Sequence, residues 1–449
     1  MKKNTIGEQG LYDARTLGIP KMLLLGCQHT FAMFGATILV PILTGLDIAT
    51  TLLMAGLGTL FFHLISKGKV PAFLGSSFAF LGGYAAVAPL LEDGSANVAM
   101  LPYASLGIAC AGLLYLALAG FFKLFDVKKV MRFFPPVVTG PIIIAIGLIL
   151  APSAVTNCQT NWFLALVAFL TIIICNIWGK GMVKILPILI GIAVSYIVAI
   201  CIGAVDFAET FKDVPIIAFP IKKSEIVFGN IKDTSLAVNA IIAIMPIALA
   251  SMMEHIGDIC AISSTVGKNY LADPGLHRTL TGDGLATTLS ALFGGPANTT
   301  YGENTGVLAL TKVYDPRVIR IAAVFAVILS FFPVVSTAIS TIPSAIIGGV
   351  SLILYGMISA IGVRNLVENN VDLSKSRNII IAATILVTAL GFNSVGGLSF
   401  QIGEATITIT GLALAAVLGI FLNAVIPGND YEFKNDNAEE AKTGVSFEI

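Results

Sequence analysis

The stretch Ser251-Met252-Met253-Glu254-His255-Ile256-Gly257-Asp258-Ile259 places three ionisable side chains inside an apolar segment that spans about residues 236–264. On a helix, Glu254 and Asp258 are four residues apart and share one face, whereas His255 is turned about 100° from Glu254. An acidic side chain at the centre of a membrane-spanning helix costs about 2.5–3.5 kcal/mol on insertion scales. Two such acids on one face therefore indicate a functional site in preference to a polar network that only joins helices.

The overall composition is that of a polytopic membrane protein. Hydrophobic residues make up 56% of the 449 residues and charged residues 12%, and the mean hydropathy is +0.91. The formal net charge is zero, so no large basic surface argues for a nucleic-acid partner. The six cysteines lack Cys-x-x-Cys spacing and fall mostly in apolar runs, which favours small buried side chains over a metal site or disulfides.

About fourteen apolar segments follow one another along the chain, separated by charged residues or by Pro and Gly. We therefore expect an all-α polytopic membrane protein. All but four of the 26 Lys and Arg residues fall in alternate connections or at the two ends, and the remaining four lie in the long loop before residue 236. Because cytoplasmic loops collect Lys and Arg, this alternation predicts a multi-pass protein of the cytoplasmic membrane with both termini in the cytoplasm.

Two halves of the chain resemble each other. Gln28-His29 lies in the first segment and Glu254-His255 in the eighth; Ser76-Ser77-Phe78 and Thr299-Thr300-Tyr301 each follow in the second segment after them. Seven segments precede the second copy, so it enters the membrane from the opposite side, as in the inverted repeats of secondary transporters.

Both triplets lie in stretches that disfavour a regular helix. Residues 71–78 and 294–306 are dense in Pro, Gly, Asn, Ser and Thr at membrane depth, which frees backbone N–H and C=O groups. Paired interruptions in corresponding places of two halves predict a transport site near the midplane of the membrane.

Glu303 adds a third acid in the second interrupted stretch, and no Lys or Arg lies inside the segments that carry the three acids. Without a fixed cationic partner these acids must be protonated, bind a cation or hydrogen-bond a ligand. Desolvation and mutual repulsion both favour the neutral form, so the cluster is suited to proton exchange and to ion-coupled transport. The sequence holds no His-Glu-x-x-His, Gly-x-Ser-x-Gly or phosphate-loop motif, and we expect no enzyme activity, no metal and no cofactor other than a coupling proton.

Several motifs together closely resemble the bacterial uracil permeases of the nucleobase–ascorbate transporter family. They are Gln28-His29-Thr30-Phe31-Ala32-Met33-Phe34-Gly35-Ala36-Thr37, Leu74-Gly75-Ser76-Ser77-Phe78-Ala79-Phe80, Glu254-His255, Pro296-Ala297-Asn298-Thr299-Thr300-Tyr301-Gly302-Glu303-Asn304 and Gly349-Val350-Ser351-Leu352-Ile353-Leu354-Tyr355-Gly356. The resemblance covers nearly the whole chain. It implies seven-plus-seven inverted repeats with short β-strands in spans 3 and 10, and a homodimer formed through the gate domains.

The resemblance also implies a division into a core domain and a gate domain. The core segments are residues 22–122 and 236–332, and the gate segments are residues 123–205 and 339–425. Residues 206–235 are expected to form an extracellular loop, and residues 1–21 and 426–449 the cytoplasmic ends.

Carried over by position, the resemblance implies uracil binding by the side chains of Glu254 and Glu303 and by the backbone of Phe78, Gly302 and Glu303. Asp258 takes part in proton coupling together with Glu254 and Glu303; some uracil permeases have His at the position of Asp258, which leaves the identity of the proton carrier open. Supporting or gate-side roles are expected for Gln28, His29, Asn304, Ser351 and Tyr355. We expect His29 to hydrogen-bond within the core, and either Phe78 or Tyr301 to cover the face of the uracil ring.

The sequence leaves alternatives and some lesser expectations. A xanthine or other purine permease, a sodium-coupled permease and an anion exchanger of the same fold remain rivals, although Glu303 favours uracil over xanthine and an acidic site disfavours anions. We expect Asp283 to cap a short ninth helix at residues 285–293. We expect His63 to be an ordinary surface or interfacial group near the end of its span.

Overall fold

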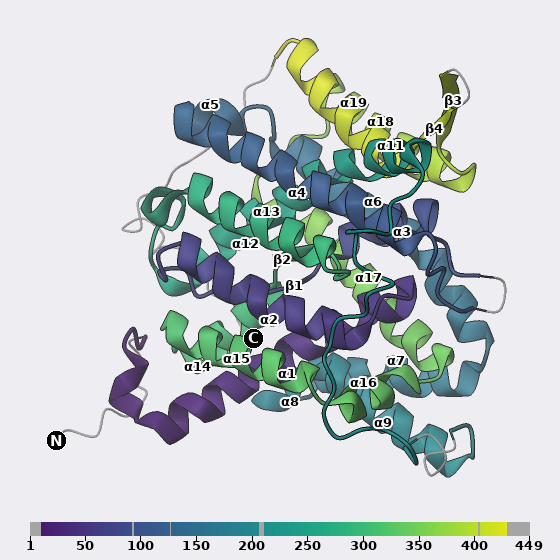
Figure 1. Cartoon of the computed structure of the whole chain (residues 1–449). Helices are drawn as coiled ribbons and strands as arrows, with labels where there is room; N and C mark the ends of the chain where they lie inside the picture. Colours follow the sequence, from purple (N-terminus) through teal and green to yellow (C-terminus); the bar gives the residue numbers. More distant parts are fainter. Residues whose placement is uncertain (1–9, 92–93, 126, 206–210, 403–404, 429–449) are drawn as a thin grey trace.

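The structure is a computed structural model of the chain, and it describes residues 10–91, 94–125, 127–205, 211–402 and 405–428. Helices dominate these ranges, and the order of elements repeats (Figure 1). Each half contains two helices, a three-residue strand that leads into a short helix, and then four further helical crossings.

The elements of the first half are η1 (Ala14–Leu17), α1 (Ile19–Thr44), α2 (Ile48–Ile65), β1 (Leu74–Ser76), η2 (Phe78–Phe80), α3 (Leu81–Val87), α4 (Leu101–Leu124), α5 (Val127–Met131), α6 (Pro136–Gln159), α7 (Trp162–Ile177), α8 (Met182–Ile185) and α9 (Pro187–Cys201). Those of the second half are α11 (Thr234–Ile244), η3 (Met245–Ile247), α12 (Ala248–Val266), η4 (Leu271–Gly275), α13 (Leu276–Leu292), β2 (Asn298–Thr300), α14 (Gly302–Thr311), α15 (Pro316–Ser330), α16 (Pro333–Ser340), α17 (Ser344–Glu368), α18 (Ser376–Ser394), β3 (Leu398–Ile402), β4 (Ala405–Ile409) and α19 (Gly411–Val425).

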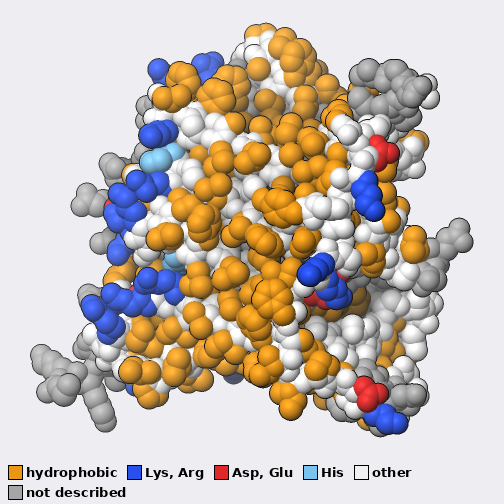
Figure 2. Space-filling model, viewed as in Figure 1, with side chains coloured by type: hydrophobic (Ala, Val, Ile, Leu, Met, Phe, Trp, Pro, Cys, Tyr) orange, Lys and Arg blue, Asp and Glu red, His pale blue; other side chains and the backbone are white. Residues whose placement is uncertain are grey.

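The fold is that of a multi-pass membrane protein. Seven of the described helices are long and apolar enough to span a membrane by themselves, with α11 to α12 counted as one, and the pair α15–α16 forms an eighth candidate that is bent by 83°. Hydrophobic side chains cover most of the face seen in Figure 2, whereas Lys and Arg gather mainly along one edge of it. The expected all-α polytopic fold, with short strands in the third and tenth crossings, is confirmed.

The two strands lie near the middle of the view in Figure 1 and pair with each other in an antiparallel ladder, with Leu74 opposite Thr300 and Ser76 opposite Asn298. The ladder continues by one bond at each end: Ser77 N–H donates to the Ala297 carbonyl at 2.9 Å, and Tyr301 N–H donates to the Phe73 carbonyl at 3.0 Å. Buried backbone groups need such partners because unpaired ones are costly inside a membrane. The interruptions predicted from Pro, Gly and Ser/Thr are therefore paired with each other.

The helices pack in two groups around this ladder. The pairs α2–α15, α4–α13 and α1–α15 bring core segments together, and the pairs α6–α17, α7–α9 and α18–α19 bring gate segments together. Contacts between the groups include α12 with α6 and η3 with α19. The element α12 therefore lies where the two groups meet.

The ninth span begins earlier than its apolar run. Helix α13 starts at Leu276 after Gly275, and Asp283 lies buried in its middle, so the prediction that Asp283 caps a short helix at residues 285–293 is wrong. The first turns of α13 are polar in sequence, yet Thr279, Gly282 and Asp283 are buried where the helix packs on α2 and α4. A helix that is covered by other helices does not need a continuous apolar run.

The loop between the two halves is fastened to the first half at the start of α2. Lys222 Nζ lies 2.7 Å from Asp47 Oδ2, and Asp47 N–H donates to Glu225 Oε2 at 3.0 Å. The Thr50 hydroxyl donates to the Pro220 carbonyl. Glu225 is almost fully buried by these contacts.

Candidate functional site

One face of α12 touches both interrupted crossings. Ser251, Glu254 and Asp258 are spaced i, i+3 and i+7, which places them on the same side of the helix. The Ser251 hydroxyl lies 3.3 Å from that of Ser77, which directly follows β1. Two turns further along, Asp258 Oδ2 accepts a hydrogen bond of 2.8 Å from the hydroxyl of Thr300, the last residue of β2. Glu254 therefore lies between the two points at which α12 meets the crossings.

The three acids, Glu254, Asp258 and Glu303, lie close to one another and are partly accessible. Ionised Glu254 would be repelled by Glu303, and Asp258 by both of them. All three side chains are partly exposed, and Gly257 beside them is exposed with no atom within 4 Å of where a Cβ would lie. Glu254 and Asp258 thus line an accessible side of α12, and Glu303 joins them from α14.

Helix α14 begins at this cluster. Its first residue, Gly302, is exposed, and a Cβ built on it would lie 4.0 Å from Asp258 Oδ1. Among the described residues no side chain caps this helix, whose N-cap is Tyr301. The first N–H groups of a helix have no partner within it and carry a partial positive charge, so they can donate to carbonyl or carboxylate oxygens. Glu303 places a carboxylate in this same first turn.

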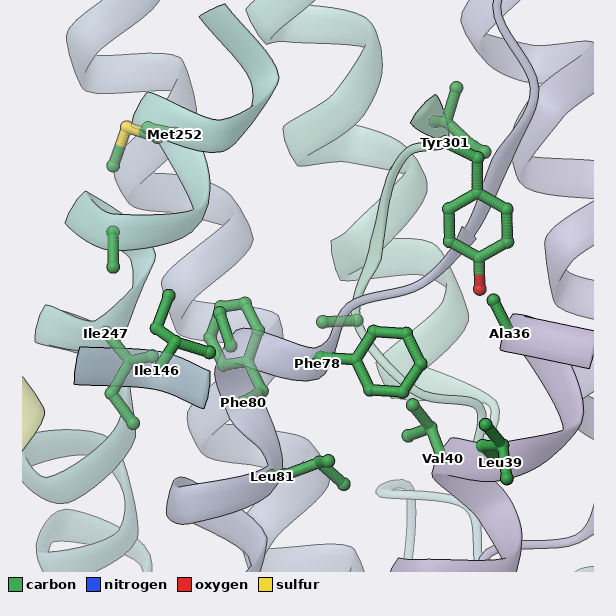
Figure 3. Packing of buried hydrophobic residues seen from close by; sticks show 14 of the residues in the cluster. Ala36, Leu39, Val40, Phe78, Phe80, Leu81, Ile146, Ile247, Met252 and Tyr301 are labelled. Carbon is green, nitrogen blue, oxygen red and sulfur yellow. The ribbon is translucent and has the colours of Figure 1, made fainter. Parts of the chain in front are cut away.

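Tyr301 and Phe78 occupy different surroundings. The Tyr301 hydroxyl donates to the Ser76 carbonyl at 3.1 Å and accepts from the Thr37 hydroxyl at 3.3 Å. Figure 3 shows this hydroxyl pointing toward Ala36 of α1. The ring also lies so close to Gly75 that a Cβ there would be 2.4 Å from it. Tyr301 thus fastens β1 to α1, and its ring is engaged in packing.

Phe78 lies at the junction between core and gate segments. It is 7% exposed and borders a cavity of about 10 Å³, which is also lined by Ile146 and Leu150 of α6, Ile247 of η3 and Leu412 of α19. Such a cavity holds about one water molecule and is far too small for a pyrimidine ring. Phe78 is therefore packed in mainly apolar surroundings, and the cavity beside it leaves no room for a ligand; Figure 3 shows Phe78 with Ile146 and Ile247 among these apolar side chains.

His29 of the first half and His255 of the second half each contact a side chain of another helix. Asn304 Nδ2 donates to His29 Nδ1 at 3.1 Å and to the His29 carbonyl at 3.0 Å, so His29 does hydrogen-bond within the core segments. His255 Nδ1 lies 3.1 Å from Asp283 Oδ2, and both side chains are 0% exposed. The sequence prediction missed this second pair because it placed Asp283 at a helix end.

The remaining predicted residues lie near or beside this centre. Gln28 is half-buried on α1 next to His29. Ser351 and Tyr355 are buried on α17, four residues apart and hence on one face, and α17 packs along α6. His63 is not a surface group: it is buried, and its Nε2–H donates to the Ala72 carbonyl at 2.9 Å just before β1. The prediction for His63 is wrong because a span end is covered here by the chain that enters the strand.

Two contacts of the site were not anticipated. Ser251 and Ser77 were not recognised as partners, and the hydroxyl of Thr300 was not linked to Asp258. The i, i+3, i+7 spacing of Ser251, Glu254 and Asp258 was the available signal, since it places all three on the face that meets the breaks.

A separate hollow of about 530 Å³ lies between α5 and the end of α19 and is lined by Lys129 and Arg132 among others. It shares no residue with the acid cluster. We therefore keep the site at α12, where the buried polar groups and the interrupted crossings meet.

Comparisons with known proteins agree with this architecture. A family model for xanthine and uracil permeases, described as "Permease family", matches residues 20–396. The uracil permease of Bacillus caldolyticus is 40% identical over 445 residues, covering 95% of this chain and 96% of the relative, and that of Bacillus subtilis (strain 168) is 40% identical over 418 residues, covering 89% and 91%. The transmembrane domain of the cyanobacterial bicarbonate transporter BicA superposes with a TM-score of 0.58 at 16% identity, covering 93% of this chain and all of that one. These relatives are permeases and transporters, not enzymes.

Proposed function

The chain belongs to the permease family of xanthine and uracil carriers, and on that premise we propose that it imports uracil across the cytoplasmic membrane together with protons. The named relatives support the substrate, since uracil permeases 40% identical to this chain cover almost its whole length. The observation that carries the mechanism is the face of α12, on which Ser251 and Asp258 each contact one interrupted crossing and Glu254 lies between them.

The site chemistry suits a pyrimidine. Uracil presents two N–H donors and two carbonyl acceptors in one plane. The Glu254 carboxylate can accept an N–H, and N–H groups in the first turn of α14, other than that of Glu303, which bonds its own carboxylate, can donate to a carbonyl. Gly302 leaves room for a ligand to approach this backbone because it has no side chain. The acidic centre disfavours an anion such as bicarbonate, even though the fold is shared with anion transporters.

Proton coupling follows from the absence of a fixed cation. No Lys or Arg lies in the spans of Glu254, Asp258 and Glu303, so a bound proton is the simplest charge partner when uracil binds. Coupled acids titrate as a group, and we assign the proton to the cluster as a whole. The core segments would then move against the gate segments and release uracil and proton into the cytoplasm.

The exposure pattern supports a form of the carrier that is open to the cytoplasm. From Glu254 toward the end of α12 the residues Gly257, Ala261 and Ser264 on the same side are exposed, whereas the cavity beside Phe78 leaves no room for a ligand. The alternation of basic residues in the sequence predicts that the end of α12 lies on the cytoplasmic side, with both termini. We further propose, from the family resemblance, that two copies associate through their gate segments.

The test is uptake of labelled uracil by proteoliposomes that contain the purified protein. An inward proton gradient should drive accumulation, a protonophore should abolish it, and excess unlabelled uracil should compete. Uridine and xanthine should compete at least about tenfold less well because they are larger than uracil. Sulfate should compete at least about tenfold less well because it lacks the N–H and carbonyl pattern of the free base. Uptake that persists with the protonophore and requires sodium would replace the proton in this proposal, and competition by sulfate would replace the substrate.

A further inference from the structure

Two hydroxyl residues, one from each interrupted crossing, hold α12 at two points. Ser77 follows β1 and Thr300 ends β2, and each is the middle residue of its repeated triplet. Ser77 meets Ser251, and Thr300 meets Asp258, two turns away on the same face of α12. Both contacts join an interrupted crossing to α12 through a hydroxyl group, but only the second contact involves a carboxylate, which can take up a proton.

The hydroxyl of Thr300 is held in place from both sides. Thr300 is 1% exposed and pairs with Leu74 in the strand ladder, and the Leu74 carbonyl and N–H are bonded to the Thr59 hydroxyl on α2. A hydroxyl placed in this way can give its proton to an ionised carboxylate at 2.8 Å, and such charge-assisted bonds are stronger than neutral ones.

Protonation of Asp258 would change this bond. An ionised carboxylate only accepts hydrogen bonds, whereas a protonated one has a donor of its own, so the hydroxyl of Thr300 must then accept or turn away. Thr300 is two residues before Gly302 and three before Glu303, so any change at its hydroxyl acts directly on the start of α14. Other acids also face Asp258: Glu254 on the same helix, Glu303 on α14 and Asp283 on α13.

We propose that Thr300 is a positioning residue for proton coupling, which holds ionised Asp258 against the start of α14 and loosens when Asp258 takes up a proton. Only a proton is transferred: an O–H bond of a hydronium ion breaks as the O–H bond of the Asp258 carboxylic acid forms, and the acid later gives the proton to water on the other side and becomes a carboxylate again. This inference rests on the proposed function, because it assumes that uracil and a proton travel together.

The decisive variants change only the hydroxyl. Thr300→Val keeps the β-branched shape and removes the donor, and Thr300→Ser keeps the donor. Ser77→Ala is the matched control, since it removes the equivalent hydroxyl contact to α12 without involving an acid. Each variant is purified and reconstituted as the full chain.

Two assays separate coupling from binding. Counterflow, in which labelled uracil exchanges for unlabelled uracil at equal pH, needs the carrier but no proton gradient; gradient-driven accumulation, read together with proton entry by a trapped pH dye, needs coupling. We expect Thr300→Val to show counterflow within about threefold of that of the original protein. The same variant should reduce uracil accumulation and uracil-dependent proton entry at least about tenfold. Thr300→Ser should restore both, and Ser77→Ala should change the two assays equally and by less than about threefold.

A second comparison covers the case in which Thr300→Val alone is poorly folded. Asp258→Asn removes the proton-binding group, so adding Thr300→Val to Asp258→Asn should cause no further loss of accumulation. The proposal is overturned if the two losses add, if Thr300→Val reduces counterflow and accumulation alike, or if it accumulates uracil normally. Failure of the original protein to show counterflow or proton-driven accumulation would instead overturn the proposed function.

Discussion

The two interrupted crossings share one backbone design and differ in charge. Each has a three-residue strand, a hydroxyl contact to α12 at or directly after the end of that strand, and then an aromatic residue, Phe78 in the first and Tyr301 in the second. The first crossing and helix α1 carry the neutral residues Ser77 and Gln28, whereas the second crossing carries Glu303 and meets Asp258 of α12. Because the neutral crossing forms the same kind of strand, the acids are not needed for the strand pairing, which agrees with the proposed role of the acids in ligand and proton binding.

The histidines repeat this contrast. His29 on α1 accepts a hydrogen bond from the neutral amide of Asn304, whereas His255 Nδ1 on α12 lies 3.1 Å from a carboxylate oxygen of Asp283. Each histidine follows the residue that distinguishes the halves, Gln28 in one and Glu254 in the other. The histidine of the first half therefore contacts an amide, whereas the histidine of the second half contacts an acid.

The largest effect is expected when an acid of the second half is replaced by the neutral residue that the first half has at the corresponding position. Glu254→Gln gives α12 the same residue that α1 carries at Gln28, and we expect gradient-driven uracil uptake to fall at least about a hundredfold, because both the ligand contact and one proton-binding group are lost. Uptake into proteoliposomes measures this. Glu368→Gln is the matched control, since it makes the same change on a half-exposed carboxylate of α17 that pairs with Arg364; near-normal uptake by Glu254→Gln would remove it from the site.

A change at Glu303 tests whether the charged start of α14 sets affinity. Glu303→Gln keeps the shape and removes the charge, and a hydrogen bond to a charged group contributes about 1.5–3 kcal/mol. We expect the Kd for uracil to rise about 10- to 150-fold while the protein remains folded. Isothermal titration with uracil measures the affinity, and size-exclusion chromatography checks the fold. Unchanged affinity would show that α14 binds through its backbone alone.

The contrast between the halves also explains what sequence could and could not predict. The repeat of Gln28-His29 with Glu254-His255 and the two Pro/Gly-rich stretches were sufficient to predict inverted halves and interrupted crossings, because breaks and buried charges leave strong local signals. The depth at which Asp283 and His63 are buried could not be predicted, since it depends on which helices cover them. Likewise, the role of Tyr301 in fastening β1 to α1 depends on contacts between residues far apart in the chain.

The two histidine pairs should differ in their contribution to stability. Asp283→Ala leaves His255 buried without its partner, which costs about 1–3 kcal/mol of the free energy of unfolding. Asn304→Ala removes a neutral donor from His29 and should cost about 0.5–1.5 kcal/mol. Thermal unfolding of the purified variants in one detergent gives the order, and Asp283→Asn should recover part of the loss because its amide oxygen still accepts from His255. Equal stability of Asp283→Ala and the original protein would contradict a stabilising role for this pair.

The smallest expected effect lies in the loop that fastens the second half to the first. Burial raises the pKa of Glu225 above its usual range, and attraction to Lys222 only partly offsets this. The folded protein thus holds this proton to a higher pH than the unfolded chain does, so the stabilisation is present at low pH and is lost as the pH rises through the raised folded pKa. The Tm of the original protein relative to Glu225→Gln should therefore fall as the pH rises from about 4.3, the ordinary glutamate value, toward neutrality.

Thermal scans of both proteins over this pH range, at constant ionic strength, measure the difference. Because Glu225 belongs to the loop and not to the acid cluster, uracil binding at neutral pH should be the same in both proteins. A Tm difference that grows with pH would mean that the contact of Glu225 with Lys222 and the Asp47 N–H outweighs burial, and that the halves are joined by an ion pair in place of a protonated acid.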